Sequence, residues 1–224
     1  MDTVKSRIEY VQGEIEKAKE RAGRTDNVTL IAVTKTYGVD VMAEAYEEGI
    51  INLGENRVQE MMEKFDSFPD AHWHLIGHLQ KNKAKYVVGK AEVIHSVDSM
   101  ELLCEINRIA TKKNVVQDVL LEVNISGEIT KYGLTTDEIK DIIIKIGEMC
   151  AVRLRGFMTM APKTDDPESV RWVFKKAKEL FEFYRQNNCD IDILSMGMSN
   201  DFAVAVEEGA TCVRVGSLIF GKRN

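Results

Sequence analysis

The sequence predicts an α/β protein: a single (β/α)8 barrel of the TIM type, with one extra N-terminal helix. Short apolar runs alternate with amphipathic segments along the 224 residues, which is typical of repeated strand–helix units. Several runs are apolar on both faces, as in parallel strands covered by helices. No low-complexity linker divides the chain, so we expect one domain over residues 1–224. These features favour a closed barrel, and an open doubly wound sheet is the second interpretation.

The first element should be a helix, because apolar residues recur every three or four positions and Gly23 marks its end. Its apolar face consists of Val4, Ile8, Val11, Ile15 and Ala18. Eight apolar runs then predict the strands. They lie near 29–35, 51–55, 72–77, 93–97, 118–125, 152–160, 191–197 and 212–216.

The segments between the strands carry helix start and stop signals. Thr135 and Glu138 have the spacing of a capping box, and Asp166-Pro167 opens another helix. Gly49 and Gly209 each follow a Glu-Glu pair and precede a strand, which is typical of a helix C-terminus.

Charge and composition narrow the classes of function. The net charge of −6 offers no broad positive surface, so we expect neither nucleic acid nor an anionic membrane as a partner. The N-terminus lacks the apolar core of a secretory signal, and no run approaches about 18 apolar residues, which predicts a cytoplasmic protein. The cysteines form no C-x-x-C pair, so we expect reduced, packed thiols. They are Cys104, Cys150, Cys189 and Cys212.

Lys35 is the most informative residue of the chain. It follows the apolar run 30–34, at the C-terminal end of the first predicted strand. A lysine anchored there can condense with a carbonyl if burial lowers its pKa, because the neutral amine is the nucleophile. Lys35 is therefore a Schiff-base candidate, and the alternative is a solvated charge at a strand end.

Other candidate residues also follow strand ends, where barrels place the residues that do chemistry. The loops after the seventh and eighth strands indicate a phosphate site, because Ser199 and the pair Gly216-Ser217 offer hydroxyls and backbone N–H groups where helices begin. Alternatively, Ser199 caps a helix over 200–208, and Gly216-Ser217 is an ordinary turn. The positions predicted at strand ends are Lys35, Asn56, Gly77, His78, Asn124, Met160, Ser199, Gly216 and Ser217.

Arg214 lies on the eighth strand, and alternation places it on the opposite face from Val213 and Val215. An unpaired buried guanidinium is very costly, so an arginine that points into the barrel needs a partner. The partner is either a carboxylate, such as Glu55 or Glu122, or a ligand atom that accepts hydrogen bonds.

Three histidines raise the question of a metal site. His72 and His74 form an H-x-H pair on one strand face, with His78 nearby, but no carboxylate or thiol pattern completes a site. We expect no metal, and the pair can equally point away from the barrel interior. The methionines near strand ends should fill the barrel, and Met198 can touch a ligand. These methionines are Met158, Met160, Met196 and Met198.

In their order along the chain, these residues resemble the pyridoxal-phosphate homeostasis proteins, single-domain barrels similar to the N-terminal domain of alanine racemases. The match runs almost end to end, although each motif alone is weak. His78 and Ser217 stand where related chains can carry proline or threonine. The matching segments are Ala32-Val33-Thr34-Lys35-Thr36, Leu53-Gly54-Glu55-Asn56-Arg57-Val58-Gln59-Glu60, Trp73-His74-Leu75-Ile76-Gly77-His78-Leu79-Gln80-Lys81-Asn82-Lys83, Leu154-Arg155-Gly156-Phe157-Met158, Leu194-Ser195-Met196-Gly197-Met198-Ser199-Asn200-Asp201 and Val213-Arg214-Val215-Gly216-Ser217-Leu218-Ile219-Phe220-Gly221.

The resemblance implies that Lys35 holds pyridoxal 5′-phosphate (PLP) as an internal aldimine, with Asn56 near the aldimine side. It also implies that Arg214 faces the pyridine nitrogen. Because arginine stays protonated, that nitrogen would accept a hydrogen bond and remain unprotonated, which weakens the ring as an electron sink. The residues implied for the phosphate are Ser199, Gly216 and Ser217. A reduced adduct on Lys131 or Lys163 would contradict this assignment.

The function that the resemblance implies is PLP binding in intracellular vitamin B6 homeostasis, by storage or delivery without turnover. Alanine racemases continue into a β-domain and use a tyrosine of the partner subunit, and we expect neither here. We also expect a monomer, with PLP-dependent apoenzymes and amino acids as further partners. Two alternatives stay open: a PLP-dependent amino-acid racemase, and an aldolase that uses Lys35 directly on a sugar phosphate.

Overall fold

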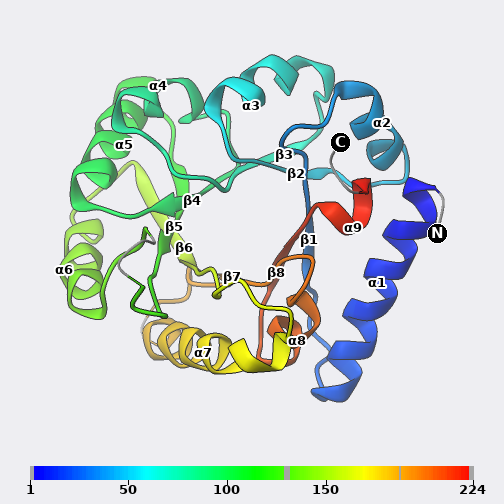
Figure 1. Cartoon of the computed structure of the whole chain (residues 1–224). Coiled ribbons are helices and arrows are strands. Elements are labelled where there is room, and N and C mark those ends of the chain that lie inside the picture. Colours follow the sequence, from blue (N-terminus) through cyan, green and yellow to red (C-terminus); the bar gives the residue numbers. More distant parts are fainter. Residues whose placement is uncertain (1–2, 129–131, 187, 222–224) are drawn as a thin grey trace.

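Eight parallel strands form one closed barrel in this computed structural model, with helices around its outside (Figure 1). The structure describes residues 3–128, 132–186 and 188–221. Neighbouring strands pair in chain order, and β8 closes the barrel on β1, where Arg214 lies opposite Ile31. The predicted barrel is confirmed, and the open sheet was wrong. The strands are β1 Thr29–Val33, β2 Asn52–Glu55, β3 His72–Leu75, β4 Val93–Val97, β5 Gln117–Glu122, β6 Val152–Met158, β7 Ile193–Ser195 and β8 Cys212–Val215.

The helices that follow the strands bury their apolar faces against the outside of the barrel. Short 3-10 turns, labelled η, extend three of them. The helical elements are α1 Val4–Arg21, α2 Val39–Glu47, α3 Val58–Lys64, η1 Phe65–Ser67, η2 Lys81–Lys83, α4 Ala84–Val87, α5 Met100–Lys113, α6 Thr136–Ile146, η3 Pro167–Val170, α7 Arg171–Arg185, α8 Phe202–Glu207 and α9 Ser217–Phe220.

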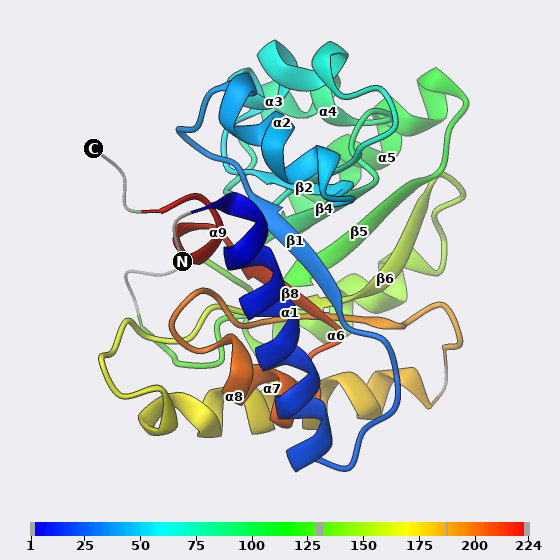
Figure 2. The ribbon, with the colours of Figure 1, turned by 90° about the vertical axis from the view of Figure 1, so that its right-hand side faces the viewer.

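The extra helix α1 lies beside β1 and packs on α8 and α9 (Figure 2). Thr3 and Ser6 cap its N-terminus reciprocally, and Gly23 follows its end with φ at +65°. The side chain of Arg7 donates a hydrogen bond of 3.2 Å to the carbonyl of Ile219, which ties α1 to the last helix.

The helix signals of the sequence are confirmed. Thr135 and Glu138 form the predicted capping box of α6. Asp166 caps the turn that Pro167 begins, but this turn is 3-10, and the α-helix starts at Arg171. Gly49 and Gly209 have φ values of +85° and +100°, which are strained for residues with a Cβ.

Strand ends differ from the predicted ranges where loops leave the barrel. The fifth strand ends at Glu122 because Leu134 returns and pairs with the backbone of Glu122 and Asn124. Alternation is as predicted in β8: Val213 and Val215 join the core under the helices, while Arg214 is buried with 3% exposure inside the barrel. Its interior also holds the apolar cluster Val93, Leu120 and Met158.

The cysteine prediction was partly wrong. All four thiols are free, but only Cys212 is buried, and Cys104, Cys150 and Cys189 are exposed. The exposed cysteines fall on the outer faces of helices or in loops, where burial does not follow from residue type alone. In the described part of the chain, no helix is both long and apolar enough to cross a membrane.

Candidate functional site

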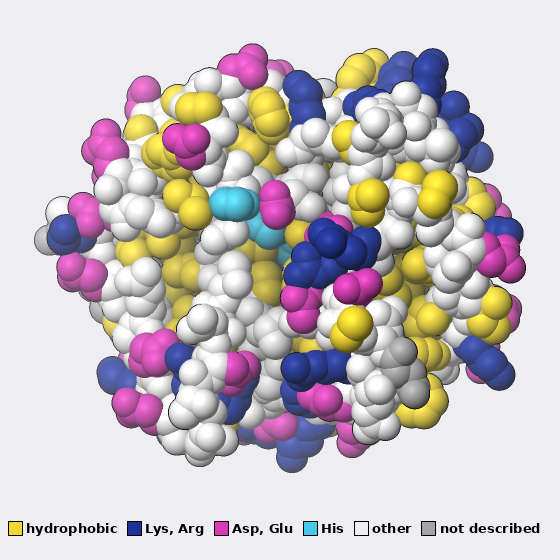
Figure 3. Space-filling view, turned by 180° about the vertical axis from the view of Figure 1, so that it is seen from behind, with side chains coloured by type: hydrophobic (Ala, Val, Ile, Leu, Met, Phe, Trp, Pro, Cys, Tyr) yellow, Lys and Arg dark blue, Asp and Glu magenta, His cyan; other side chains and the backbone are white. Residues whose placement is uncertain are grey.

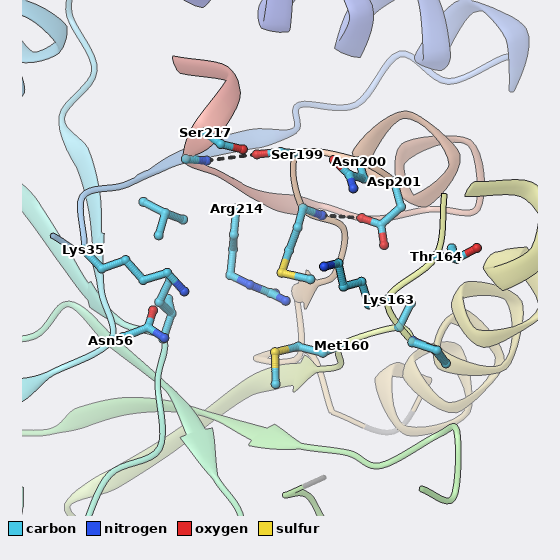
Figure 4. Close-up of a pocket in the computed structure, with 16 residues that line it drawn as sticks. Lys35, Asn56, Met160, Lys163, Thr164, Ser199, Asn200, Asp201, Arg214 and Ser217 are labelled. Carbon is cyan, nitrogen blue, oxygen red and sulfur yellow. Dashed lines mark hydrogen bonds between the residues drawn. The ribbon is translucent and has the colours of Figure 1, made fainter. Parts of the chain in front are cut away.

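A cavity of about 430 Å³ opens at the C-terminal ends of the strands. It brings together the six residues predicted to bind the cofactor, which come from four strand ends far apart in sequence, whereas the strand-end candidates Gly77, His78 and Asn124 do not line it. In Figure 4, Arg214 lies between two lysines: Lys35, with Asn56 next to it, is on one side, and Lys163 is on the other. The predicted residues that line the cavity are Lys35, Asn56, Ser199, Arg214, Gly216 and Ser217.

Helix α3 holds the backbone on both sides of Lys35. The ammonium group of Lys64 donates a hydrogen bond of 3.0 Å to the carbonyl of Thr34. The carboxylate of Glu60 accepts one of 2.8 Å from the N–H of Thr36, whose φ of +70° is unusual for a β-branched residue. The strand end is thus fixed in a strained conformation, and the Lys35 side chain lines the cavity.

Lys64 is held in turn by a buried carboxylate. Its Nζ lies 2.6 Å from Oε1 of Glu55, which also accepts a hydrogen bond of 2.7 Å from the Thr34 hydroxyl. Burial raises the pKa of Glu55, while the hydrogen bond from Lys64 opposes that rise. Glu55 therefore stabilises the end of β1 from outside the barrel, through its contacts with Thr34 and Lys64. Its predicted pairing with Arg214 was wrong.

Asn56 is positioned by the close approach of the next loop. A Cβ at Gly77 would lie 2.4 Å from the Asn56 carbonyl oxygen and 2.7 Å from its Cα. Only glycine fits there without moving the backbone that carries Asn56. This explains the glycine in the third strand-end motif.

The two loops of the predicted phosphate site contact one another. The Ser199 hydroxyl accepts a hydrogen bond of 3.4 Å from the N–H of Gly216. The interpretation of Ser199 as a helix cap was wrong, because α8 begins only at Phe202 and Asp201 accepts a 2.6 Å bond from the N–H of Met198. Ser217 is the first residue of α9, so its N–H has no partner within that helix.

Arg214 is fixed by two hydrogen bonds from its guanidinium. One Nη donates to the Ser195 hydroxyl at 2.5 Å and the other to the Thr159 carbonyl at 3.0 Å. Glu122 provides no hydrogen bond to it within the described residues, and acts on it only as a nearby charge. Burial, with the charge of Asp98, raises the pKa of Glu122 to about 7 against the opposing effect of Arg214. The need for a partner was thus confirmed, but the partners are neutral oxygens.

Several cavity residues were not predicted as site residues. Asp201 is buried, and that burial raises the pKa of its carboxyl group. Lys163 follows the sixth strand and lines the cavity opposite Lys35. Both lie in or beside segments already recognised as motifs, but their orientation depends on loop geometry. Lys131 lies outside the described residues. Met160, a strand-end candidate, and Met198, predicted to touch a ligand, also line the cavity, and the remaining new lining residues are Val33, Ile76, Ala161, Pro162, Thr164 and Asn200.

The histidines take three different environments. His74 is buried inside the barrel, whereas His72 is exposed at the start of β3 beside Glu92. His78 contacts Asp98 at 2.9 Å and stacks on Tyr132 at the rim. Within residues 3–128, 132–186 and 188–221, no group of three or more His, Cys, Asp or Glu side chains is arranged to hold a metal ion.

The closed parallel barrel of eight strands places the chain in the class of the alanine racemase N-terminal barrels. The family model described as "Alanine racemase, N-terminal domain" matches residues 9–224. Alanine racemase from Clostridium difficile has the same fold, with a TM-score of 0.78 at 15% identity over all of this chain and 60% of that one.

Closer relatives identify the branch of that family. The pyridoxal phosphate homeostasis protein of Aquifex aeolicus is 46% identical over 97% of both chains. The solved structure of PipY from Synechococcus elongatus with PLP bound has a TM-score of 0.81 at 34% identity, over 93% of this chain and all of that one. The chain belongs to the pyridoxal phosphate homeostasis protein family.

Proposed function

We propose that this protein binds PLP covalently on Lys35 and acts in PLP homeostasis by holding and handing over the cofactor, without catalytic turnover. The observation that carries the proposal is the convergence of Lys35, Arg214 and the Ser199–Gly216 contact on one cavity. Relatives along the whole chain are named for PLP homeostasis, and PipY has been solved with PLP bound.

The residues of the cavity fit PLP. Its volume of about 430 Å³ is in the range of small-molecule sites. Lysine and arginine side chains suit an anionic ligand, and the Ser199 and Ser217 hydroxyls with the N–H of Ser217 suit a phosphate group. When bound, PLP supplies an aldehyde that condenses with a neutral amine with loss of one water, and an electron-withdrawing ring.

Each residue then has a role that follows from its chemistry. Lys35 provides the amine, and α3 fixes the backbone from which it extends. Arg214 donates hydrogen bonds but cannot accept them, so a ring nitrogen in front of it accepts and stays unprotonated. Such a partner supports storage better than carbanion chemistry. Ser199, Gly216 and Ser217 hold the phosphate.

Mass spectrometry after borohydride reduction tests the covalent site. We expect a phosphopyridoxyl adduct on Lys35 in the wild type and in Lys163→Ala, and no chromophore with imine absorption in Lys35→Ala. Lys163→Ala is the matched control, because it removes the other described lysine of the same cavity. An adduct on Lys163 or Lys131 in the wild type would contradict the assignment.

Turnover is tested separately. The loaded protein is incubated with amino acids in deuterium oxide, and the α-hydrogen is followed by NMR. We expect no exchange above the rate with free PLP. Exchange that depends on Lys35 would favour the racemase, whereas an adduct formed with a sugar phosphate in the absence of PLP would favour the aldolase.

A further inference from the structure

A continuous line of hydrogen bonds runs from Arg214 through the centre of the barrel. Arg214 donates to Ser195 Oγ at 2.5 Å, and Ser195 Oγ lies 3.0 Å from Nδ1 of His95. His95 Nε2 lies 3.0 Å from Nδ1 of His74, whose Nε2 lies 3.1 Å from Oδ1 of Asn52. These residues come from five strands, β2, β3, β4, β7 and β8, so only the closed barrel brings them together.

One set of bond directions satisfies both ends of the line. Arginine can only donate, so Ser195 Oγ accepts from Arg214 and its O–H is available to His95 Nδ1. At the other end, Asn52 Oδ1 accepts, so His74 carries its proton on Nε2 and leaves Nδ1 to accept from His95 Nε2–H. Both imidazoles are then neutral Nε2–H tautomers. Burial supports this, because it lowers the pKa of His74 to about 3 and that of His95 well below its usual value.

The line connects the two mouths of the barrel. Arg214 lines the cavity at the C-terminal ends of the strands. Asn52, His74 and His95 line a second hollow, of about 300 Å³, at the N-terminal ends. Figure 3 views that opposite face, where histidine side chains lie in a hollow near the centre. A polar line through a barrel core displaces apolar packing and requires every member to be satisfied, which points to a role beyond filling space.

We infer that His95 is a positioning residue for Arg214, acting through the Ser195 hydroxyl, and that His74 and Asn52 set the tautomer that His95 must adopt. The inference rests on the proposed function, in which Arg214 faces the pyridine nitrogen. The Ser195 and Thr159 contacts hold two of the five N–H bonds of Arg214 and so set the orientation of the guanidinium toward the cavity. His95 keeps the Ser195 hydroxyl turned so that its oxygen lone pairs face Arg214.

Two amide substitutions separate this role from general support of the core. In His95→Asn, the amide oxygen lies two bonds from Cβ, as Nδ1 does, and can still accept from Ser195. In His95→Gln, the amide lies three bonds from Cβ, as Nε2 does, and can donate to His74 but not accept from Ser195. Each variant loses one buried hydrogen bond, so both should lose similar stability. Only the Gln variant should release Arg214.

The first measurement needs no cofactor. Nitrogen-15 NMR of the wild type should show both buried imidazoles as neutral Nε2–H tautomers, and an Nδ1–H tautomer at His95 would overturn the inference even if neither variant folds. The Arg214 guanidinium, assigned with Arg214→Lys, should give separate Nη signals in the wild type and His95→Asn, and averaged signals in His95→Gln.

The second measurement uses PLP. We expect His95→Gln and Ser195→Ala to weaken PLP binding about tenfold and to shift the absorption of the bound cofactor, and His95→Asn to stay within about twofold of the wild type. Equal effects of the Asn and Gln substitutions would overturn the inference. If the wild type itself binds no PLP, the proposed function fails, while the NMR result still decides whether His95 positions Arg214.

Discussion

The carboxylate of Glu60 accepts a hydrogen bond of 2.8 Å from the backbone N–H of Thr36. Glu60 and Lys64 lie one turn apart on α3, so the same helix face holds the residues before and after Lys35. The backbone that carries Lys35 is thus positioned by a helix that follows the next strand, not by its own strand alone.

If Lys35 binds PLP as proposed, replacing Glu60 should weaken that binding. We expect Glu60→Ala to raise the dissociation constant for PLP about 5- to 30-fold, because the strained Thr36 loses a charge-assisted bond worth about 1–2 kcal/mol. Absorbance titration measures this. Glu63→Ala is the control, because Glu63 is exposed on the same helix and its loss changes the net charge equally. Equal affinity of Glu60→Ala and wild type would contradict the role.

The buried pair Lys64–Glu55 should dominate stability near the site. Lys64→Met leaves the Glu55 carboxylate, fully buried, without its cation, and should cost about 3–5 kcal/mol of unfolding free energy. Adding Glu55→Gln should restore part of the loss, since no buried charge remains. Urea unfolding of the single and double variants measures both. A double variant less stable than Lys64→Met would refute this account.

Gly77 should not tolerate a side chain. In Gly77→Ala the new Cβ meets the Asn56 backbone, so we expect a loss of about 1–3 kcal/mol in stability and weaker PLP binding. Gly38→Ala is the matched control, because a Cβ there has no atom within 4 Å. Thermal unfolding and absorbance titration of both variants test the difference, and a fully native Gly77→Ala would show that the loop can move freely.

Ser199→Ala tests the phosphate assignment. The Ser199 hydroxyl accepts a hydrogen bond from the N–H of Gly216 and, in the proposed function, donates one to the phosphate. Its removal should therefore weaken PLP binding about 5- to 30-fold. Pyridoxal, which lacks the phosphate, should bind the variant and the wild type alike. If both ligands lose affinity equally, Ser199 supports the cavity but does not contact the phosphate.

Glu122 should give the protein a specific pH dependence. Its pKa of about 7 in the folded state lies above its ordinary value of 4.5, so the folded state holds the proton more tightly. The contribution of Glu122 to the free energy of unfolding is fully present below pH 4.5 and is lost as the pH rises through 7. The total change is at most roughly 3 kcal/mol. Unfolding free energies of wild type and Glu122→Gln at pH 4.5 and pH 8 measure this. If the pH dependence of stability is the same in Glu122→Gln as in the wild type, Glu122 is not its source.

Most of the fold could be predicted from local patterns in the sequence. The apolar runs, the capping box at Thr135 and the helix ends at Gly49 and Gly209 all act over a few residues, so the sequence shows them directly. The cysteines show the limit of such prediction. Whether a side chain is buried depends on whether it faces the barrel, and the residue type alone did not predict this for the three exposed cysteines.

The order of strand–helix units and the side chains that end each strand can be predicted from the amino-acid sequence, because both follow from short-range pattern and chain connectivity. What those side chains contact depends on how the barrel closes. Arg214 meets Ser195 and not Glu55, and Lys64 reaches the carbonyl before Lys35, because barrel closure and strand register bring together residues that are distant in the chain. Such contacts depend on distances between strands, which no local pattern encodes.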